Sequence, residues 1–229
     1  MIIFEINNTK AIFDEQLYTI SLNWETYQPD IRTFEQMKNL YIDELDFDNN
    51  DICYLMYRWV YLNNDDKAIF EENNLRYDVT IILPKFFGIE YNKTFWHYHP
   101  KRNENSFFEE IYQVLHWKAI YLQQNDNKSF YTKANNQDVV LMENWFWHTT
   151  INPSNNVLIM ANIVSNKFSS IYDEYKNKKW ARYYFTTSWW IKNKNYNDNV
   201  KLEESSKLFK SNDIYGDFVK NPKRFSFLN

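Results

Sequence analysis

Glycine is almost missing from this 229-residue chain, which contains only Gly88 and Gly216. A protein of average composition and this length would carry about 16 glycines, so other residues must fill the turns that need a positive φ. Cysteine occurs once, as Cys53. One thiol cannot form an internal disulfide, which suits a reducing compartment, and we expect Cys53 to be a small buried residue on a strand.

A basic surplus and a long apolar run are also missing. The net charge is −4, from 26 Lys and Arg against 30 Asp and Glu, which leaves no electrostatic footprint for nucleic acid. No apolar run approaches the roughly 20 residues of a membrane-spanning helix. The opening MIIFEINNTK has none of the three regions of a secretory signal. We therefore expect a cytoplasmic protein that binds neither nucleic acid nor membranes.

Short strand-like runs fill most of the chain between Ile52 and about Thr187. They are rich in β-branched and aromatic residues, and polar segments with Asn, Asp, Lys and Pro separate them. The runs are ICYLMYRWVYL, RYDVTIIL, EEIYQVL, KAIYLQQ, DVVLME, VLIMANIV and ARYYFTT. Many short strands without strand–helix alternation predict an all-β sandwich or closed barrel.

We predict one barrel domain over residues 51–196, flanked by two extensions. Residues 1–50 are predicted to form an N-terminal arm with a short helix that packs on the barrel. Residues 197–229 are rich in Lys, Ser and Asn, and we predict that they wrap the surface as a polar extension or are partly disordered.

Two short helices are predicted. The first covers Thr33–Tyr41, where Thr33 and Gln36 have the spacing of a capping box ahead of an apolar stretch. The second lies near Ser170–Asn177.

Three of the four histidines have a spacing that suits a metal site. His97 and His99 are two residues apart, so on a strand their rings point to the same face. Glu110 opens a later predicted strand, and His148 follows another. Taken singly, these would be exposed strand histidines, a solvated acidic edge and a structural histidine. Together they predict a metal bound by three nitrogens and one carboxylate, with positions open for substrate oxygens.

The fourth histidine, His116, has no such context, and we expect it in a turn.

The order H-x-H, E-I-Y and H-x-x-x-N resembles the two motifs of the cupin superfamily. The matching residues are His97, His99, Glu110, His148 and Asn152. More narrowly, Arg76–Val164 resembles the cupin-type (archaeal-type) glucose-6-phosphate isomerases through RYDVTIILP, GIEYNKTFWHYHP, EEIYQVL and HTTIN. The likeness extends over about 24–196 through RTFEQMK, MYRWVYL and WARYYFTTSWWIKNKNY.

The resemblance implies a cupin fold, which is a double-stranded β-helix or jelly-roll barrel, with a few short helices. It implies a homodimeric enzyme of glycolysis and gluconeogenesis that interconverts glucose 6-phosphate and fructose 6-phosphate. One divalent ion, Fe, Mn, Zn or Ni, would bind to His97, His99, Glu110 and His148, and this ligand set does not select among the four metals. Glu110 would be the general base of an enediol mechanism. A metal-assisted hydride shift would use the same ligands and stays open.

The resemblance also implies that hydroxyls and backbone amides, rather than a lysine cluster, bind the substrate phosphate. The candidate substrate-binding residues are Thr80, Thr94, Tyr61, Tyr112, the backbone at Trp96 and, on a looser match, Tyr172.

Two other functions are compatible with the same ligands. One is an Fe(II) cupin dioxygenase, which would need a pocket for a thiol or catechol. The other is a non-catalytic cupin sugar-binding module, in which the metal site has decayed.

Six tryptophans stand where the resemblance places glycine. They are Trp59, Trp96, Trp117, Trp147, Trp180 and Trp189. A bulky residue at a positive-φ turn costs ~1–2 kcal/mol. We hypothesise that the organism reads UGA as glycine, and that this sequence was translated with UGA as tryptophan. If tryptophan is instead genuine, the indole of Trp96 is expected to crowd the phosphate entrance.

Overall fold

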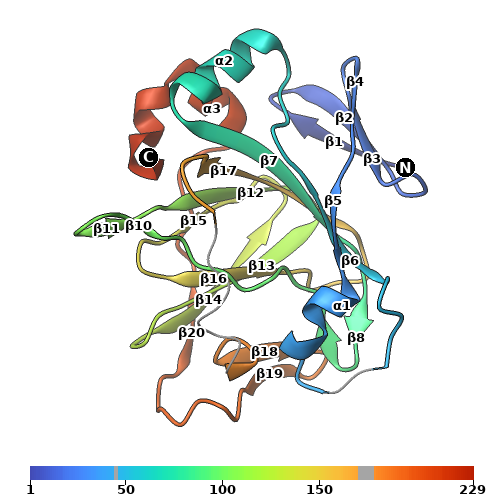
Figure 1. Ribbon diagram of the computed structural model, residues 1–229, viewed down its shortest axis with the longest axis vertical. Coiled ribbons are helices and arrows are strands. Elements are labelled where there is room, and N and C mark those ends of the chain that lie inside the picture. The colour runs from blue at the N-terminus through green and yellow to red at the C-terminus, as the bar shows by residue number, and fades with distance from the viewer. Residues whose placement is uncertain (44–45, 170–177) are drawn as a thin grey trace.

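Two sheets form the body of the protein in this computed structural model, which describes residues 1–43, 46–169 and 178–229 (Figure 1). The larger sheet has the strand order β15-β12-β17-β7-β6-β5. Its strands are β5 (Asp30–Thr33), β6 (Ile52–Tyr57), β7 (Leu75–Ile82), β12 (Glu110–His116), β15 (Val139–Met142) and β17 (Leu158–Ser165). The smaller sheet has the order β16-β13-β14-β20. Its strands are β13 (Lys118–Gln124), β14 (Ser129–Asn135), β16 (Trp147–Ile151) and β20 (Leu202–Ser205).

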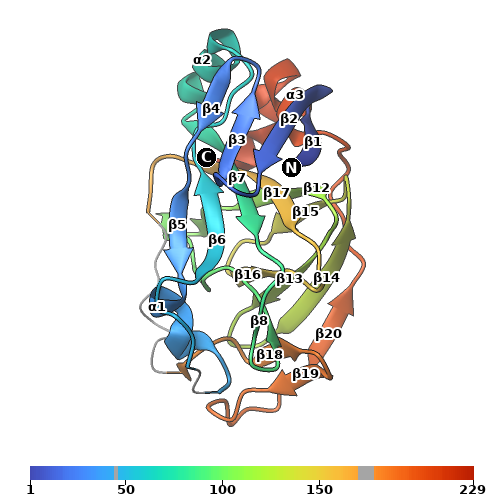
Figure 2. The ribbon, with the colours of Figure 1, turned by 90° about the vertical axis from the view of Figure 1, so that its right-hand side faces the viewer.

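Three further sheets and a few short helices complete the fold. The strands are β1 (Ile2–Ile6), β2 (Thr9–Asp14), β3 (Thr19–Leu22), β4 (Glu25–Tyr27), β8 (Phe86–Phe87), β9 (Glu90–Tyr91), β10 (Lys101–Asn103), β11 (Ser106–Phe107), β18 (Tyr183–Thr186) and β19 (Trp189–Lys192). The helices are α1 (Phe34–Met37), η1 (Lys38–Leu40), α2 (Asn64–Glu72), α3 (Ile214–Lys220) and η3 (Pro222–Leu228). Figures 1 and 2 show β1–β4, α2 and α3 at one end of the barrel and β18 and β19 at the other.

The central strands β7 and β17 are buried on both faces, which explains the nearly continuous apolar run of β17. Tyr77, Val79 and Ile81 on β7 belong to the core cluster that also contains residues of β1–β3 and α3. Because side chains alternate along a strand, Asp78 and Thr80 point the other way, into the barrel. The all-β barrel predicted from the sequence is confirmed.

Strands of both main sheets also lie outside the range 51–196 that was predicted for the barrel. Residues 1–27 are not a simple arm, because β1–β4 form a sheet of their own. β5 lies in the larger sheet, and β20 pairs in parallel with β14, so the barrel extends beyond 51–196. The C-terminal segment does not merely wrap the surface, because α3 buries Ile214, Tyr215 and Phe218 in the core.

Several local predictions are confirmed. The helix predicted at Thr33–Tyr41 is present as α1 and η1, and Thr33 N donates to Gln36 Oε1 (3.1 Å). Cys53 is buried on β6. The turn expected at His116 is wrong, because His116 is the last residue of β12. The helix predicted near 170–177 lies outside the described residues. Among the described residues, no helix is long and apolar enough to cross a membrane.

Asparagine and tryptophan occupy the left-handed backbone positions that glycine would usually take. Asparagines with positive φ are Asn7, Asn8, Asn23 and Asn74, and tryptophans with positive φ are Trp59 (58°), Trp117 (74°), Trp145 (72°) and Trp189 (114°). Asparagine tolerates this region, whereas a bulky residue there is an outlier. Of the six tryptophans picked from the sequence, Trp96, Trp147 and Trp180 do not have positive φ and are buried. Trp145 was missed.

Candidate metal centre

The chain around the H-x-H motif runs antiparallel beside β16, which carries the third histidine. Thr94 N donates to Thr150 O (2.8 Å), and His148 N donates to His97 O (3.2 Å). This pairing sets His97 directly opposite His148. Residues that are some fifty positions apart in the sequence are thus held side by side by backbone hydrogen bonds.

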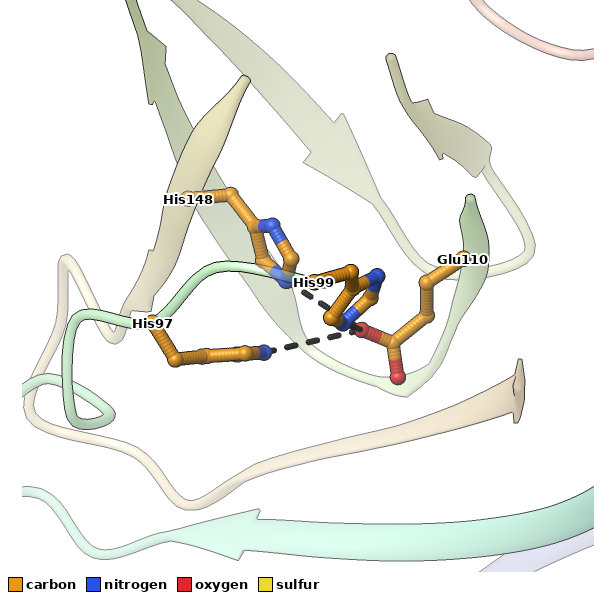
Figure 3. Close-up of side chains that lie close together, drawn as sticks. All are labelled: His97, His99, Glu110 and His148. Carbon is orange, nitrogen blue, oxygen red and sulfur yellow. Dashed lines mark hydrogen bonds and ion pairs between the residues drawn. The ribbon is translucent and has the colours of Figure 1, made fainter. Parts of the chain in front are cut away.

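The four predicted ligands converge on one point (Figure 3). Glu110 is the first residue of β12, and its Oε2 lies 3.1 Å from His148 Nε2, 3.3 Å from His99 Nε2 and 3.7 Å from His97 Nε2. The ligand atoms of the four residues all lie within 4.8 Å of one another. The structure therefore brings together the complete metal-ligand set that the sequence predicts.

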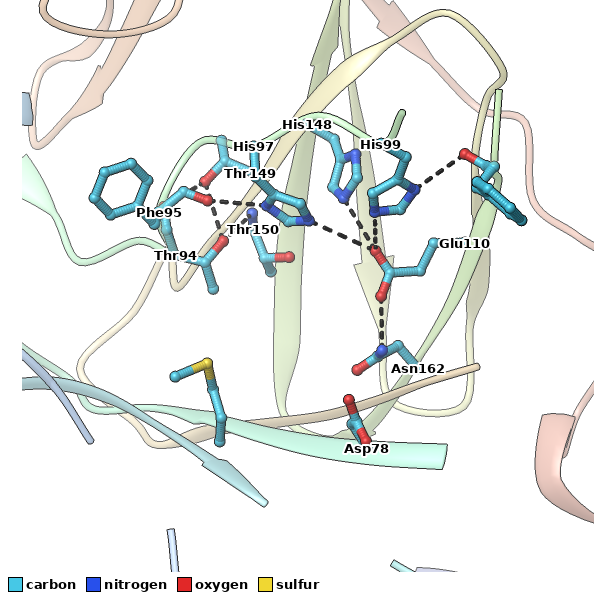
Figure 4. A network of polar contacts seen from close by, with 12 residues as sticks. Asp78, Thr94, Phe95, His97, His99, Glu110, His148, Thr149, Thr150 and Asn162 are labelled. Atoms are coloured by element: carbon cyan, nitrogen blue, oxygen red, sulfur yellow. Dashed lines mark hydrogen bonds and ion pairs between the residues drawn. The ribbon is translucent and has the colours of Figure 1, made fainter. Parts of the chain in front are cut away.

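Backbone carbonyls orient two of the imidazole rings (Figure 4). His97 Nδ1 lies 3.1 Å from Phe95 O, and His99 Nδ1 lies 3.0 Å from Phe108 O. Because a carbonyl oxygen can only accept, each Nδ1 must carry the proton and donate it. In the neutral ring, Nε2 then presents its lone pair to the centre of the cluster, which is the arrangement of a histidine that binds a metal.

The protonation states also suit a cation. Burial alone raises the pKa of Glu110, but contacts with the ring nitrogens of His148, His97 and His99 outweigh it, and the pKa lies well below its usual value. Burial, reinforced by His97, lowers the pKa of His148 to about 3. An ionised carboxylate and a neutral imidazole are the forms that bind divalent metals. The residues present therefore fit a divalent ion.

A cavity of about 370 Å³ adjoins the cluster inside the barrel. His97, His99 and Glu110 form part of its wall, as do three of the predicted substrate-binding residues, Thr80, Thr94 and Tyr112. A volume of this size lies within the range of small-molecule sites, roughly 300–1,000 Å³.

Two of the other predicted substrate-binding residues, Tyr61 and Trp96, do not line this cavity. The ring of Tyr61 packs against Phe70 (5.4 Å between centroids) in the outer core. The indole of Trp96 packs against Trp147 (6.5 Å between ring centroids) and Trp180 (5.7 Å). Contrary to the expectation, it does not crowd the cavity. Tyr172 lies outside the described residues.

Four polar residues that were not singled out from the sequence also line the cavity: Arg58, Arg76, Asp78 and Asn162. Arg76 Nε donates to Asp78 Oδ2 (2.8 Å), and Arg58 Nη1 donates to the same oxygen (3.3 Å). The signal for two of them was the run RYDVT, since alternation puts Arg76 and Asp78 on the same face as the predicted Thr80. The sequence did not indicate which face of β7 would line the cavity.

Solved structures with a similar chain path are distant. An oxalate decarboxylase from Lactobacillus farciminis is 18% identical, with a TM-score of 0.40, over 56% of this chain and 32% of that one. The 7S globulin of Momordica charantia is 11% identical, with a TM-score of 0.40, over 62% and 33%. An oxalate oxidase in complex with the substrate analogue glycolate is 12% identical, with a TM-score of 0.36, over 44% and 47%. The chain spans less than half of each, and no functional conclusion follows from likeness at this level.

Sequence comparison gives a firmer assignment. No curated protein matches the chain significantly. The family model described as glucose-6-phosphate isomerase (GPI) matches residues 31–201, which is most of the chain and includes all four ligands of the candidate metal centre. The chain therefore belongs to the cupin-type glucose-6-phosphate isomerase family.

Proposed function

We propose that this protein is a metal-dependent aldose–ketose isomerase that interconverts glucose 6-phosphate and fructose 6-phosphate. One observation carries the proposal: His97, His99, His148 and Glu110 converge beside a cavity of small-molecule size. Membership of the isomerase family supports it. A decayed, non-catalytic site is disfavoured because all four ligands are intact and correctly oriented.

A divalent ion bound by these residues would act as a Lewis acid that polarises the sugar carbonyl. Glu110 is the proposed general base, which takes the proton from C2 of the aldose and returns it to C1. The carboxylate of Glu110 is buried and ionised, and Glu110 is one of the residues that line the cavity. Burial keeps bulk water from competing for the proton during the transfer.

The phosphate end of the substrate is proposed to lie at Thr80 and Thr94. Thr94 Oγ1 also accepts from Thr150 N (3.0 Å) and lies 3.2 Å from Thr149 Oγ1. This hydroxyl therefore also links its segment to β16. The guanidinium groups of Arg58 and Arg76 add hydrogen-bond donors to the same cavity, where both also pair with Asp78. Such a wall suits a polyhydroxylated anion better than the thiol or catechol of a cupin dioxygenase.

A coupled assay that follows glucose 6-phosphate formation from fructose 6-phosphate tests the proposal. Protein loaded with Mn, Fe, Zn or Ni in turn should be active, and EDTA should abolish the activity until metal is restored. Elemental analysis of each batch reports the bound metal. Turnover that is insensitive to the chelator, or metal-loaded protein without turnover, would reject the isomerase function.

Glu110→Gln is the matching variant, with Glu109→Gln as its control. Loss of a general base lowers the rate by about 10²–10⁴-fold, so Glu110→Gln should fall by at least the lower figure. Glu109 is the neighbouring residue and lies outside the cavity, where its Oε1 accepts from Asn144 N (3.3 Å). Glu109→Gln should keep the activity. The expected homodimer stays a prediction, which size-exclusion chromatography can test.

A further inference from the structure

A buried asparagine touches the oxygen of Glu110 that the histidines leave free. Asn162 lies in the middle of β17 and is 5% exposed. Its Nδ2 donates to Glu110 Oε1 at 2.6 Å, whereas the three histidines face Oε2. The two oxygens of this carboxylate therefore have different partners.

The orientation of the Asn162 amide follows from chemistry. An ionised carboxylate can only accept hydrogen bonds, so the amide nitrogen, and not the amide oxygen, must face Glu110. On the other side of Asn162, Asp78 lies directly opposite on β7. Figure 4 shows Asn162 between the carboxylates of Glu110 and Asp78. A neutral donor in this place separates two buried acidic groups and satisfies one of them.

We propose that Asn162 is a positioning residue that fixes the rotation of the Glu110 carboxylate. The last torsion of a glutamate side chain is broad and roughly two-fold, so packing alone does not decide which oxygen faces the histidines. The hydrogen bond from Asn162 keeps Oε1 away from the cluster, so Oε2 would be the oxygen presented to a bound ion. Outer partners of this kind typically contribute 10–100-fold to metal affinity or activity.

Metal titration of Asn162→Leu, without any substrate, tests this role. Leucine keeps the approximate volume and removes the donor. We expect Co²⁺ to bind about 10–100-fold more weakly, with a changed visible absorption spectrum because the carboxylate can turn. Asn162→Ala provides a second variant if leucine disturbs folding. Wild-type affinity and an unchanged spectrum in both variants would overturn the proposal.

Asn193→Ala is the matched control for the loss of a buried asparagine. Asn193 is 2% exposed and donates to Lys178 O (2.9 Å) and Ala181 O (3.0 Å), outside the cavity. Its removal should lower thermal stability but leave Co²⁺ affinity and spectrum unchanged. A Co²⁺ response in Asn193→Ala equal to that of the Asn162 variants would also refute a specific role for Asn162.

The consequence for catalysis rests on the proposed function. In fully metal-loaded Asn162→Leu, kcat should fall by about 10–100-fold while KM stays within about threefold, because Glu110 and not substrate binding is affected. Weaker substrate binding alone, seen as a higher KM with kcat unchanged, would contradict this role. If the loaded wild-type protein has no isomerase activity, the proposed function fails, but the Co²⁺ titration still decides the role of Asn162.

Discussion

Four tryptophans hold a backbone conformation that glycine adopts without strain. Trp59, Trp117, Trp145 and Trp189 have positive φ, and their exposed fractions lie between 36% and 53%. Burial of the indole therefore offsets the strain only in part. The structure separates these turn positions from Trp96, Trp147 and Trp180, whose rings are buried in the core. The hypothesis that UGA encodes glycine is best supported at the four strained positions.

Trp117→Gly should stabilise the protein. Trp117 follows β12 at φ 74° and is 42% exposed, so glycine relieves strain and removes little buried surface. We expect the free energy of unfolding to rise by about 1 kcal/mol, measured by urea denaturation. Trp117→Ala should not give this gain, because alanine is still strained at positive φ. If alanine stabilises as much as glycine, the strain is not the cause.

The codons give an independent test at the same positions. If the recoding hypothesis holds, the gene has UGA at positions 59, 117, 145 and 189. UGG at most of these positions would show that the tryptophans are genuine and that the turns are strained in the natural protein.

At the scale of elements, a buried ion pair anchors the segment that leads to the H-x-H motif. Lys93 Nζ donates to Glu90 Oε1 (2.6 Å) and to Leu40 O (2.9 Å), and it lies 3.7 Å from the ring centroid of Trp180. Burial lowers the pKa of Lys93 to about 8, although Glu90 opposes the shift. Glu90 Oε2 accepts from Ile42 N (2.7 Å). The pair thus joins β9 to the segment that follows η1.

Breaking this pair from one side should destabilise the protein strongly. Lys93→Met leaves the buried Glu90 without its cation, which costs about 3–5 kcal/mol. The double variant Lys93→Met/Glu90→Gln leaves no uncompensated charge, so its loss should be smaller than the sum of the two single losses. Urea denaturation of the wild-type protein, Lys93→Met, Glu90→Gln and the double variant gives the coupling energy between the two residues. Strictly additive losses would mean that the two residues stabilise the fold independently.

The sequence predicts the strands and the H-x-H pair from local spacing, whereas Glu110 and His148 were identified from the order of the motifs along the chain. His97 and His99 are two residues apart, which puts both rings on one face of a strand. The short runs rich in β-branched residues are typical of strands. The sheet of β1–β4 and the helix α3 were missed, because their burial depends on contacts with the outer face of the larger sheet. The alternation in β7 puts Asp78 and Thr80 on one face, but both faces of this strand are buried, so the pattern could not show that this face lines a cavity.

Tyr61 illustrates a different limit. Its position was carried over by resemblance, but the chain turns sharply at Trp59, where φ is 58°. Beyond this turn the ring of Tyr61 packs on Phe70 in the outer core. A positional match along the sequence does not reveal the direction of a side chain that follows such a turn.

At the scale of the whole molecule, the buried cluster links folding to pH. The pKa of His148 is about 3 in the folded protein and about 6.5 in an unfolded chain. Between these values the unfolded chain binds a proton that the folded protein does not. Stability is therefore fully present above about pH 6.5 and falls as the pH drops towards about 3.

Urea denaturation in EDTA across this pH range measures the effect. The free energy of unfolding of the wild-type protein should decrease steadily with acid. In His148→Gln the decrease should be shallower, because the variant has lost the group that titrates only when unfolded. Glu110 also has a lowered pKa, so some acid dependence remains. An identical slope in the two proteins would show that His148 does not make this contribution.

Metal binding should stabilise the whole barrel, since the site requires the H-x-H segment, β12 and β16 to be folded at once. A ligand that binds only the folded state at 100 times its Kd adds about 2.7 kcal/mol, which we expect to see as a higher Tm with Mn²⁺ or Zn²⁺ than with EDTA. Protons compete with the metal for the imidazole nitrogens, so the gain should shrink as the pH falls.

Two histidine variants separate specific from adventitious binding in that experiment. His99→Gln removes a ligand and should lose most of the metal-dependent rise in Tm. His116 lies at the end of β12, outside the cluster, so His116→Gln should keep the full rise. Equal responses from the two variants would place the stabilising metal elsewhere on the protein. A response lost only in His99→Gln would tie the stability of the entire fold to the convergence of the four ligands.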